Sequence, residues 1–173
     1  TITAENSITG TEFSAKAGSA GVVGLGAAIA YMDVTGTTQI LIRNTADISG
    51  KGGVAGNASL VVNVNPTADG FAGGWVAAGL AAARLKVAGK TLIQADRGSR
   101  LASANGDVAL TAYQTLTTNA SSMAAGGGYA AAEASVALVD VSSETTVDSA
   151  ANVEAAKGNY SILAKQVLNS QAV

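Results

Sequence analysis

The chain has 173 residues, of which 48% are hydrophobic, and its 10 Lys and Arg against 12 Asp and Glu give a net charge of −2. This length allows one domain with a sizeable core, and the scattered basic residues form no stripe that would attract a nucleic acid. The absence of cysteine and histidine excludes disulfides, thiol nucleophiles, a Ser-His-Asp triad and most zinc sites.

The first predicted element is a glycine-rich apolar run, GVVGLGAAIAYM at 21–32. It is shorter than the roughly 18 apolar residues of a membrane-spanning helix and is interrupted by glycines, so we expect no transmembrane segment. Glycine fills 21 positions, and aromatic residues make up only 4% of the chain. The core must therefore be built from small side chains, and facing alanines and glycines would let two walls of a flattened fold approach closely.

Similar runs recur further along the chain, as GGWVAAGLAAARLKV from Gly73 and GGGYAAAEASVALVDV from Gly126, each followed by a polar segment that contains threonine. This repetition divides the chain into the end of a preceding unit at 1–20 and further units at 21–72, 73–125 and 126–173. We expect a single array of about three units from a longer repeat protein.

A short motif recurs with the units: GNASL at 56–60, GDVAL at 106–110 and GNYSI at 158–162, in steps of 50 and 52 residues. Repeats of this kind stack, so that like positions lie over one another. We predict that the glycine of the motif turns a corner and that its last residue fills one interior position in every layer. These positions are Gly56, Gly106 and Gly158, and Leu60, Leu110 and Ile162.

Alternating residues, as in TQILIRN at 38–44, favour β-strands within each unit. The alanine-rich segment 76–89 could also form a helix, because Ala, Leu, Arg and Lys are strong helix formers. Its glycines and its counterpart at 21–34, which is rich in β-branched residues, favour a strand instead. We therefore predict an all-β fold, a parallel β-helix with about two coils per unit of about 50 residues. A jelly-roll-like β-sandwich that serves as a filament subunit is the alternative.

Candidate chemistry is sparse. Asp140 with Glu144 and Asp33 with Asp47 are the nearby carboxylate pairs that could act on sugars, but we interpret them as solvated charges. The repeated Gly-Gly-x-Gly-x-Asp motif of calcium-binding β-helices is absent, so we expect no metal site, and we also expect no cofactor.

Three asparagines satisfy the glycosylation pattern Asn-x-Ser/Thr, at Asn57, Asn119 and Asn159. Two of them, Asn57 and Asn159, also occupy the second position of the repeated motif. Glycosylation at these positions is therefore a minor hypothesis beside a structural role at a corner.

The segments LASANGDVALTAYQTLTTNA and VEAAKGNYSILAKQ resemble the coils of filamentous-haemagglutinin-like exoproteins. The segment AGVVGLGAAIAYMDVTGTTQILI is similar to the repeats of large, leukotoxin-like bacterial surface adhesins. The resemblance covers most of the chain, and it implies a right-handed parallel β-helix, an exported surface filament and adhesion.

We therefore expect an extracellular or cell-surface protein with a structural and adhesive role and no enzymatic activity. Exposed Thr, Ser and Asn side chains of a repetitive surface would bind host glycans or proteins, each weakly, with avidity from the array. The other expected partners are neighbouring repeats or adjacent copies of the same polymer. Two alternatives stay open: a self-assembling subunit of a pilus-like fibre, joined by strand pairing between copies, and a β-helical polysaccharide lyase or glycosidase.

Overall fold

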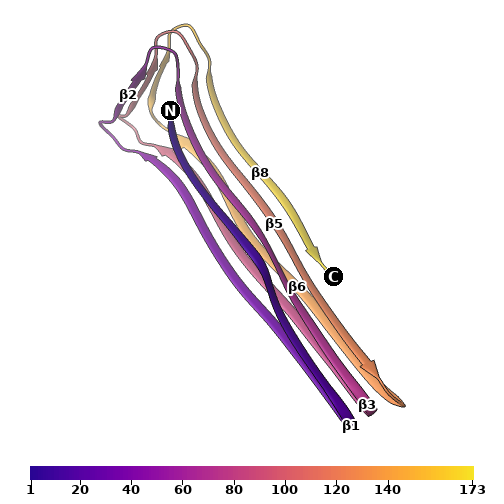
Figure 1. Ribbon diagram of the computed structural model, residues 1–173. Helices are drawn as coiled ribbons and strands as arrows, with labels where there is room; N and C mark the ends of the chain where they lie inside the picture. The colour runs from indigo at the N-terminus through magenta and orange to yellow at the C-terminus, as the bar shows by residue number, and fades with distance from the viewer.

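The computed structural model describes residues 1–10 and 13–173, and among them the chain forms β-structure without any helix (Figure 1). No described helix is therefore long and apolar enough to cross a membrane. The strands in chain order are β1 (Ile2–Ile42), β2 (Asp47–Gly50), β3 (Val54–Ala95), β4 (Arg100–Ser103), β5 (Val108–Gly127), β6 (Ala130–Ser149), β7 (Asn152–Ala155) and β8 (Tyr160–Ala172).

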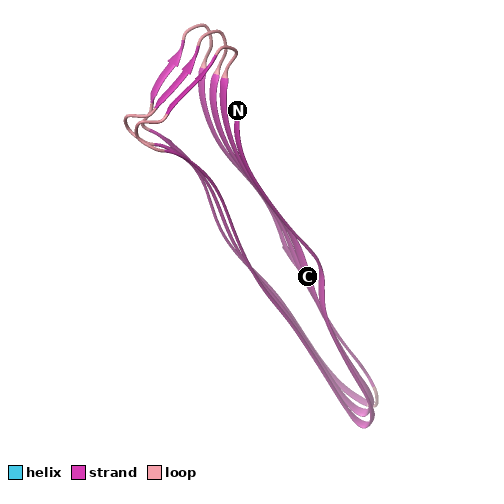
Figure 2. Cartoon of the chain, turned by 60° about the vertical axis from the view of Figure 1, so that its left-hand side comes forward, coloured by secondary structure: helices cyan, strands magenta, loops and turns pink.

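The chain runs along one long wall, reverses at a thin tip and returns along a second wall (Figure 2). The short strands β2, β4 and β7 form a separate sheet at the opposite end, here called the end sheet. All described strand pairings are parallel, which excludes the antiparallel jelly-roll alternative. The first wall consists of 2–20, 54–73, 108–127 and 160–172, and the second wall consists of 22–42, 76–95 and 130–149.

Paired residues lie one full unit apart in the sequence. Ile2 at the start of β1 pairs with Gly56, and Val108 at the start of β5 pairs with Tyr160. Each unit therefore makes one circuit of the fold, and the prediction of about two coils per unit is wrong. The reason is strand length: β5 and β6 each run for 20 residues, because small interior residues let two long walls lie directly against each other.

The register also corrects the predicted stacking of the repeated motif. Leu110 pairs with Ile162, but Ile162 is 47% exposed and does not fill an interior position. The other neighbour of Leu110 is Gly56, whereas Leu60 pairs with Gln114. The segment equivalent to GDVAL in the first layer is therefore 52–56, four residues before the predicted copy at 56–60. Glycine at position 56 has a packing reason, because a Cβ there would lie 2.9 Å from Cδ2 of Leu110.

The corner glycines follow the same corrected register. Gly106 stacks on Gly52 rather than on Gly56. The two lie so close that a Cβ at Gly106 would collide with the carbonyl of Gly52. Gly158 approaches the carbonyl of Gly106 in the same way. One column of glycines therefore turns the corner between the end sheet and the first wall in successive layers.

Near the tip the two walls approach backbone to backbone. A Cβ at Gly70 or at Gly26 would collide with the carbonyl of Leu80 or of Phe71, and one at Gly79 would lie 2.8 Å from the carbonyl oxygen of Ala125. The sequence-based prediction that facing small residues would let the walls close together is confirmed here. The alanine-rich segment 76–89 belongs to strand β3, so the helical alternative for it is wrong.

Away from the tip, larger side chains separate the walls and form two hydrophobic clusters. One cluster centres on Leu60, Leu85 and Leu116, and the other, next to the end sheet, centres on Ile93 and Leu110. A polar seam contains the buried Thr38, Thr91 and Gln114, and Thr145 Oγ1 donates a hydrogen bond of 2.7 Å to Oε1 of Gln114.

Candidate ligand-binding surfaces

The outward side chains of the first wall form a polar face, defined here as the outward positions of 55–69, 109–121 and 161–171. Parallel pairing places Thr9, Asn63, Thr117 and Asn169 in one column that crosses all four layers. Asn119 and Gln171 start a second column beside it. Because strands lie about 4.8 Å apart, hydroxyl and amide groups repeat at that spacing along each column.

A groove interrupts the polar face, and one of its lining residues, Asn65, directly precedes the only proline of the chain, Pro66. Pro66 has no N–H to donate to a neighbouring strand. The pairing of β3 with β5 accordingly stops after Val64 and resumes at Thr67, and the register of β1 against β3 shifts between Gly10 and Phe13. This local loss of pairing lies where the groove opens.

The groove encloses about 550 Å³, and none of its lining residues, all in the described part of the chain, carries a charge. The Oδ1 atom of Asn119 is buried there without a hydrogen-bond partner. Amides both donate and accept hydrogen bonds, as do the hydroxyls of bound sugars. The residues that line the groove are Asn63, Asn65, Thr117, Thr118, Asn119, Leu168, Asn169, Ser170 and Gln171.

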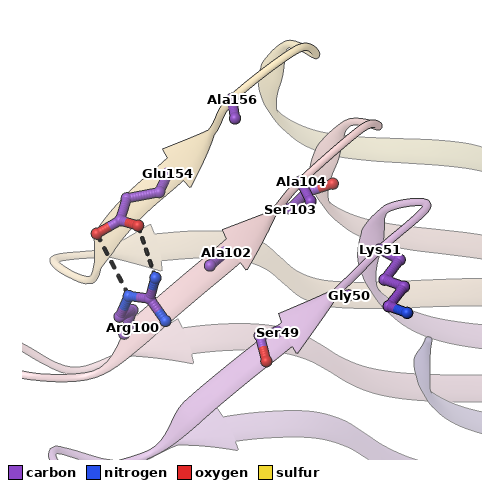
Figure 3. A pocket seen from close by; sticks show the side chains of 9 residues that line it. All are labelled: Ser49, Gly50, Lys51, Arg100, Ala102, Ser103, Ala104, Glu154 and Ala156. Carbon is purple, nitrogen blue, oxygen red and sulfur yellow. Dashed lines mark hydrogen bonds and ion pairs between the residues drawn. The ribbon is translucent and has the colours of Figure 1, made fainter.

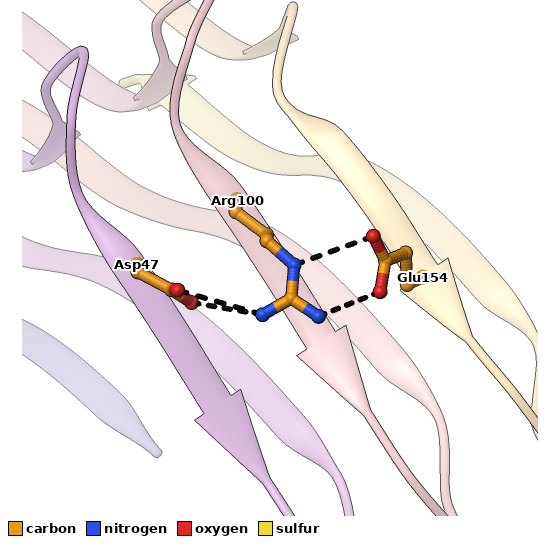
Figure 4. Close-up of polar contacts among 3 residues, drawn as sticks. All are labelled: Asp47, Arg100 and Glu154. Atoms are coloured by element: carbon orange, nitrogen blue, oxygen red, sulfur yellow. Dashed lines mark hydrogen bonds and ion pairs between the residues drawn. The ribbon is translucent and has the colours of Figure 1, made fainter.

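A second candidate surface lies on the end sheet, where one arginine bridges two carboxylates from the neighbouring strands (Figure 4). Nε and Nη2 of Arg100 in β4 donate to the carboxylate of Glu154 in β7 at 3.3 and 2.6 Å. Nη1 of Arg100 donates to Oδ1 of Asp47 in β2 at 3.2 Å. The three side chains therefore tie the three layers of the end sheet together.

A shallow depression of about 400 Å³ lies beside this ion-pair cluster (Figure 3). It is lined by Ser49, Lys51, Ser103 and both Arg100 and Glu154, together with small residues. Because Arg100 is already matched by two carboxylates, its charge is not free for an anionic ligand. We therefore regard the depression as a structural feature of the end sheet.

The ion pairs lower the pKa of two carboxyl groups, those of Glu154 and Glu144. The hydrogen bond and charge of Arg100 hold the pKa of Glu154 below its ordinary value. Lys90, whose Nζ lies 3.1 Å from Oε2 of Glu144, likewise lowers the pKa of Glu144. Both carboxyl groups are exposed, so we expect each ion pair to contribute little to stability.

The predicted carboxylate pairs lie on outer surfaces and are not brought together as pairs. Glu144 pairs with Lys90, and Asp47 pairs with Arg100. Asp33 and Asp140 lie in one column of the second wall, on either side of Lys86. Cross-strand pairs of opposite charge are the ordinary use of such positions in a sheet.

The three potential glycosylation sites lie in different settings. Asn57 lies on the polar face, between Thr3 and Thr111 in the register, and Asn159 lies in the exposed loop before β8. Asn119 lines the groove. Glycosylation at these residues stays a prediction.

Sequence reasoning missed both the groove and the ion-pair cluster. A signal for the cluster exists, because Asp47, Arg100 and Glu154 recur once per unit, at almost equal steps and with alternating charge. A search for opposite charges at one fixed spacing would have found it, and would also have given the correct register.

Replacing Arg100 with glutamine is expected to raise the pKa of Glu154 toward its ordinary value and to leave that of Glu144 low. A Lys90→Gln variant should do the reverse, and ¹³C NMR titration of the carboxyl carbons measures both. Because the folded pKa is lowered, each pair stabilises the fold above the ordinary carboxyl pKa, and this contribution disappears as the pH falls through the lowered value. Unchanged titration of Glu154 in Arg100→Gln would show that the pair does not form in solution.

No protein-family model, no curated protein and no solved structure matches the chain.

Proposed function

We propose that the chain is a non-catalytic, structural and adhesive segment of an extracellular filamentous surface protein. Its fold would be a right-handed parallel β-solenoid in which every repeat unit makes one coil. The parallel register between successive circuits supports the solenoid, and connections between parallel strands are almost always right-handed.

One observation carries the adhesive role: uncharged hydroxyl and amide groups repeat from layer to layer on the polar face and line its groove. Such groups suit a neutral ligand that carries many hydroxyls, which is the chemistry of an oligosaccharide. Each contact would be weak, and affinity would come from many units acting together.

The test uses the 173-residue chain displayed in many copies on beads and a glycan microarray of neutral and acidic oligosaccharides. We expect binding to neutral glycans, and at least about a tenfold loss of bead retention in Asn63→Ala/Asn119→Ala/Asn169→Ala, because avidity multiplies small losses per site. The matched control is Asn44→Ala/Asn105→Ala/Asn159→Ala, which removes three exposed amides outside the polar face.

Retention equal to that of the unmodified chain is expected for the control. If no glycan retained the beads, or if both triple variants bound equally well, the polar face would not be the adhesive surface.

A further inference from the structure

The outer side of the second wall carries a large apolar surface near the tip. We define the outer apolar face as the outward positions of 23–31, 76–84 and 130–138, which lie in register. Its large hydrophobic side chains are between 51% and 75% exposed, and among the outward residues of these fully described ranges Arg84, at the edge away from the tip, is the charged one. A patch of this size is comparable to the largest apolar patch on a typical monomeric protein, and such patches often have a function. The large residues are Val23, Leu25, Ile29, Tyr31, Val76, Leu80, Val136 and Leu138.

The surface shape of this face, a projecting leucine among alanines, is complementary to the same face of a second copy. Leu80 pairs with Ala27 on one side and with Ala134 on the other, and Ala78 and Ala82 are its outward neighbours along β3. One leucine therefore projects from a ring of four methyl groups. In two sheets packed face to face, inner side chains interdigitate across about 10 Å. Leu80 of a facing copy would fit over Ala78 or Ala82 of this one.

The dimensions of the face suit a pair of chains. Three strands spaced about 4.8 Å apart and nine residues at about 3.3 Å each cover roughly 14 by 30 Å. Two such faces pressed together remove at least about 800 Å² from water, and their interdigitated side chains bring this toward the roughly 1,200 Å² of a small specific interface.

The surroundings of the face suit an interface rim. The in-register column of Asp33, Lys86 and Asp140 borders the face on the side away from the tip, and Arg84 lies 5.9 Å from the ring centre of Tyr31. An uncharged centre with charges of both signs at its edge is the usual arrangement of protein interfaces.

We propose that the outer apolar face is the contact between two copies of this chain, packed second wall against second wall, with Leu80 of each copy seated among the alanines of the other. The contact needs only two copies of the chain; within the filament proposed above, on which this part rests, it would join filaments side by side. It differs from strand pairing at the ends and does not depend on the adhesive role of the first wall.

Sedimentation equilibrium of the 173-residue chain tests this contact. We expect a dimer, and we expect Leu80→Glu to weaken it more than about tenfold, because a charge would be buried at the centre of the interface. The matched control is Leu163→Glu, since Leu163 is 51% exposed against 52% for Leu80 but lies on the first wall. Unchanged circular dichroism and a cooperative urea transition of both variants establish that they fold.

Disulfide trapping provides the second measurement, which is direct because the chain has no cysteine of its own. A mixture of Leu80→Cys chains with Ala78→Cys or Ala82→Cys chains should form a covalent dimer on oxidation, because the contact places these residues against each other. A mixture of Leu80→Cys with Ala109→Cys, which lies outward on the first wall, should not. A chain that stays monomeric at about 100 μM overturns the proposal. A dimer that tolerates Leu80→Glu, and that the mixed Leu80→Cys and Ala78→Cys or Ala82→Cys chains do not trap, also overturns it and assigns the contact to another surface.

Discussion

Replacing Gly70 with alanine is expected to destabilise the chain by about 3 kcal/mol or more, because the new Cβ would collide with the backbone carbonyl of Leu80 in the opposite wall. Side chains can rotate away from such a contact, but a carbonyl held in a sheet cannot. The two walls would have to separate along the tip. The residues there are mostly alanine and glycine, whose side chains are too short to fill the resulting gap. Urea unfolding followed by circular dichroism measures the loss.

The control for this prediction is Gly18→Ala, which lies in the same wall. A Cβ at Gly18 would meet no atom within 4 Å. We expect this variant to change stability by no more than about 1 kcal/mol, and the restricted unfolded chain favours a small gain. Equal stability of the two variants would mean that the walls are further apart in solution.

Leu60→Ala is expected to cost about 2–5 kcal/mol, as other buried leucine truncations do. Leu60 is fully buried, and glycines occupy the facing positions of the opposite wall. Added Cβ atoms at Gly36 and Gly89 would lie 3.0 and 3.3 Å from the methyl carbons of Leu60. Those glycines belong to hydrogen-bonded strands, so the surroundings cannot collapse into the cavity. We therefore expect a loss in the upper part of this range.

Leu163→Ala is the matched comparison for this variant, since Leu163 is 51% exposed on the first wall. Its loss should stay below about 1 kcal/mol, because surface truncations have small effects. Urea midpoints of both variants, with unchanged denaturant dependence, give the two values. A similar loss in both would contradict the burial of Leu60 between the walls.

The β-fold and the repetitive organisation could be predicted from the sequence, because strand alternation and small residues leave clear local signals. The segment 76–89 is instructive: its composition favours a helix, but its glycines and its equivalent at 21–34 correctly indicated a strand. The register could not be found from a five-residue motif. In strands built from few residue types, a five-residue sequence such as GNASL resembles GDVAL by chance. The segment that pairs in register with GDVAL begins four residues before GNASL.

The groove was beyond sequence reasoning for a different reason. Pro66 is visible in the sequence as the only proline. Its missing N–H interrupts a sheet only where a carbonyl of a neighbouring strand would otherwise accept a hydrogen bond from that position. That neighbour belongs to the next circuit of the chain, so the consequence of Pro66 depends on the register. The asparagines and threonines around it look like any other polar residues until the columns are known.

The parallel pairing of whole circuits also determines how the chain acquires its structure. Strand partners are separated by roughly three-tenths of the chain, beyond the contact order of about 0.16–0.22 that already makes all-β domains slow to fold. We expect pairing of the first two circuits to be the costly step of folding, since it orders more than half of the chain before any ladder is complete. Each later circuit would then pair with the strands already formed, so we expect the fold to grow one layer at a time.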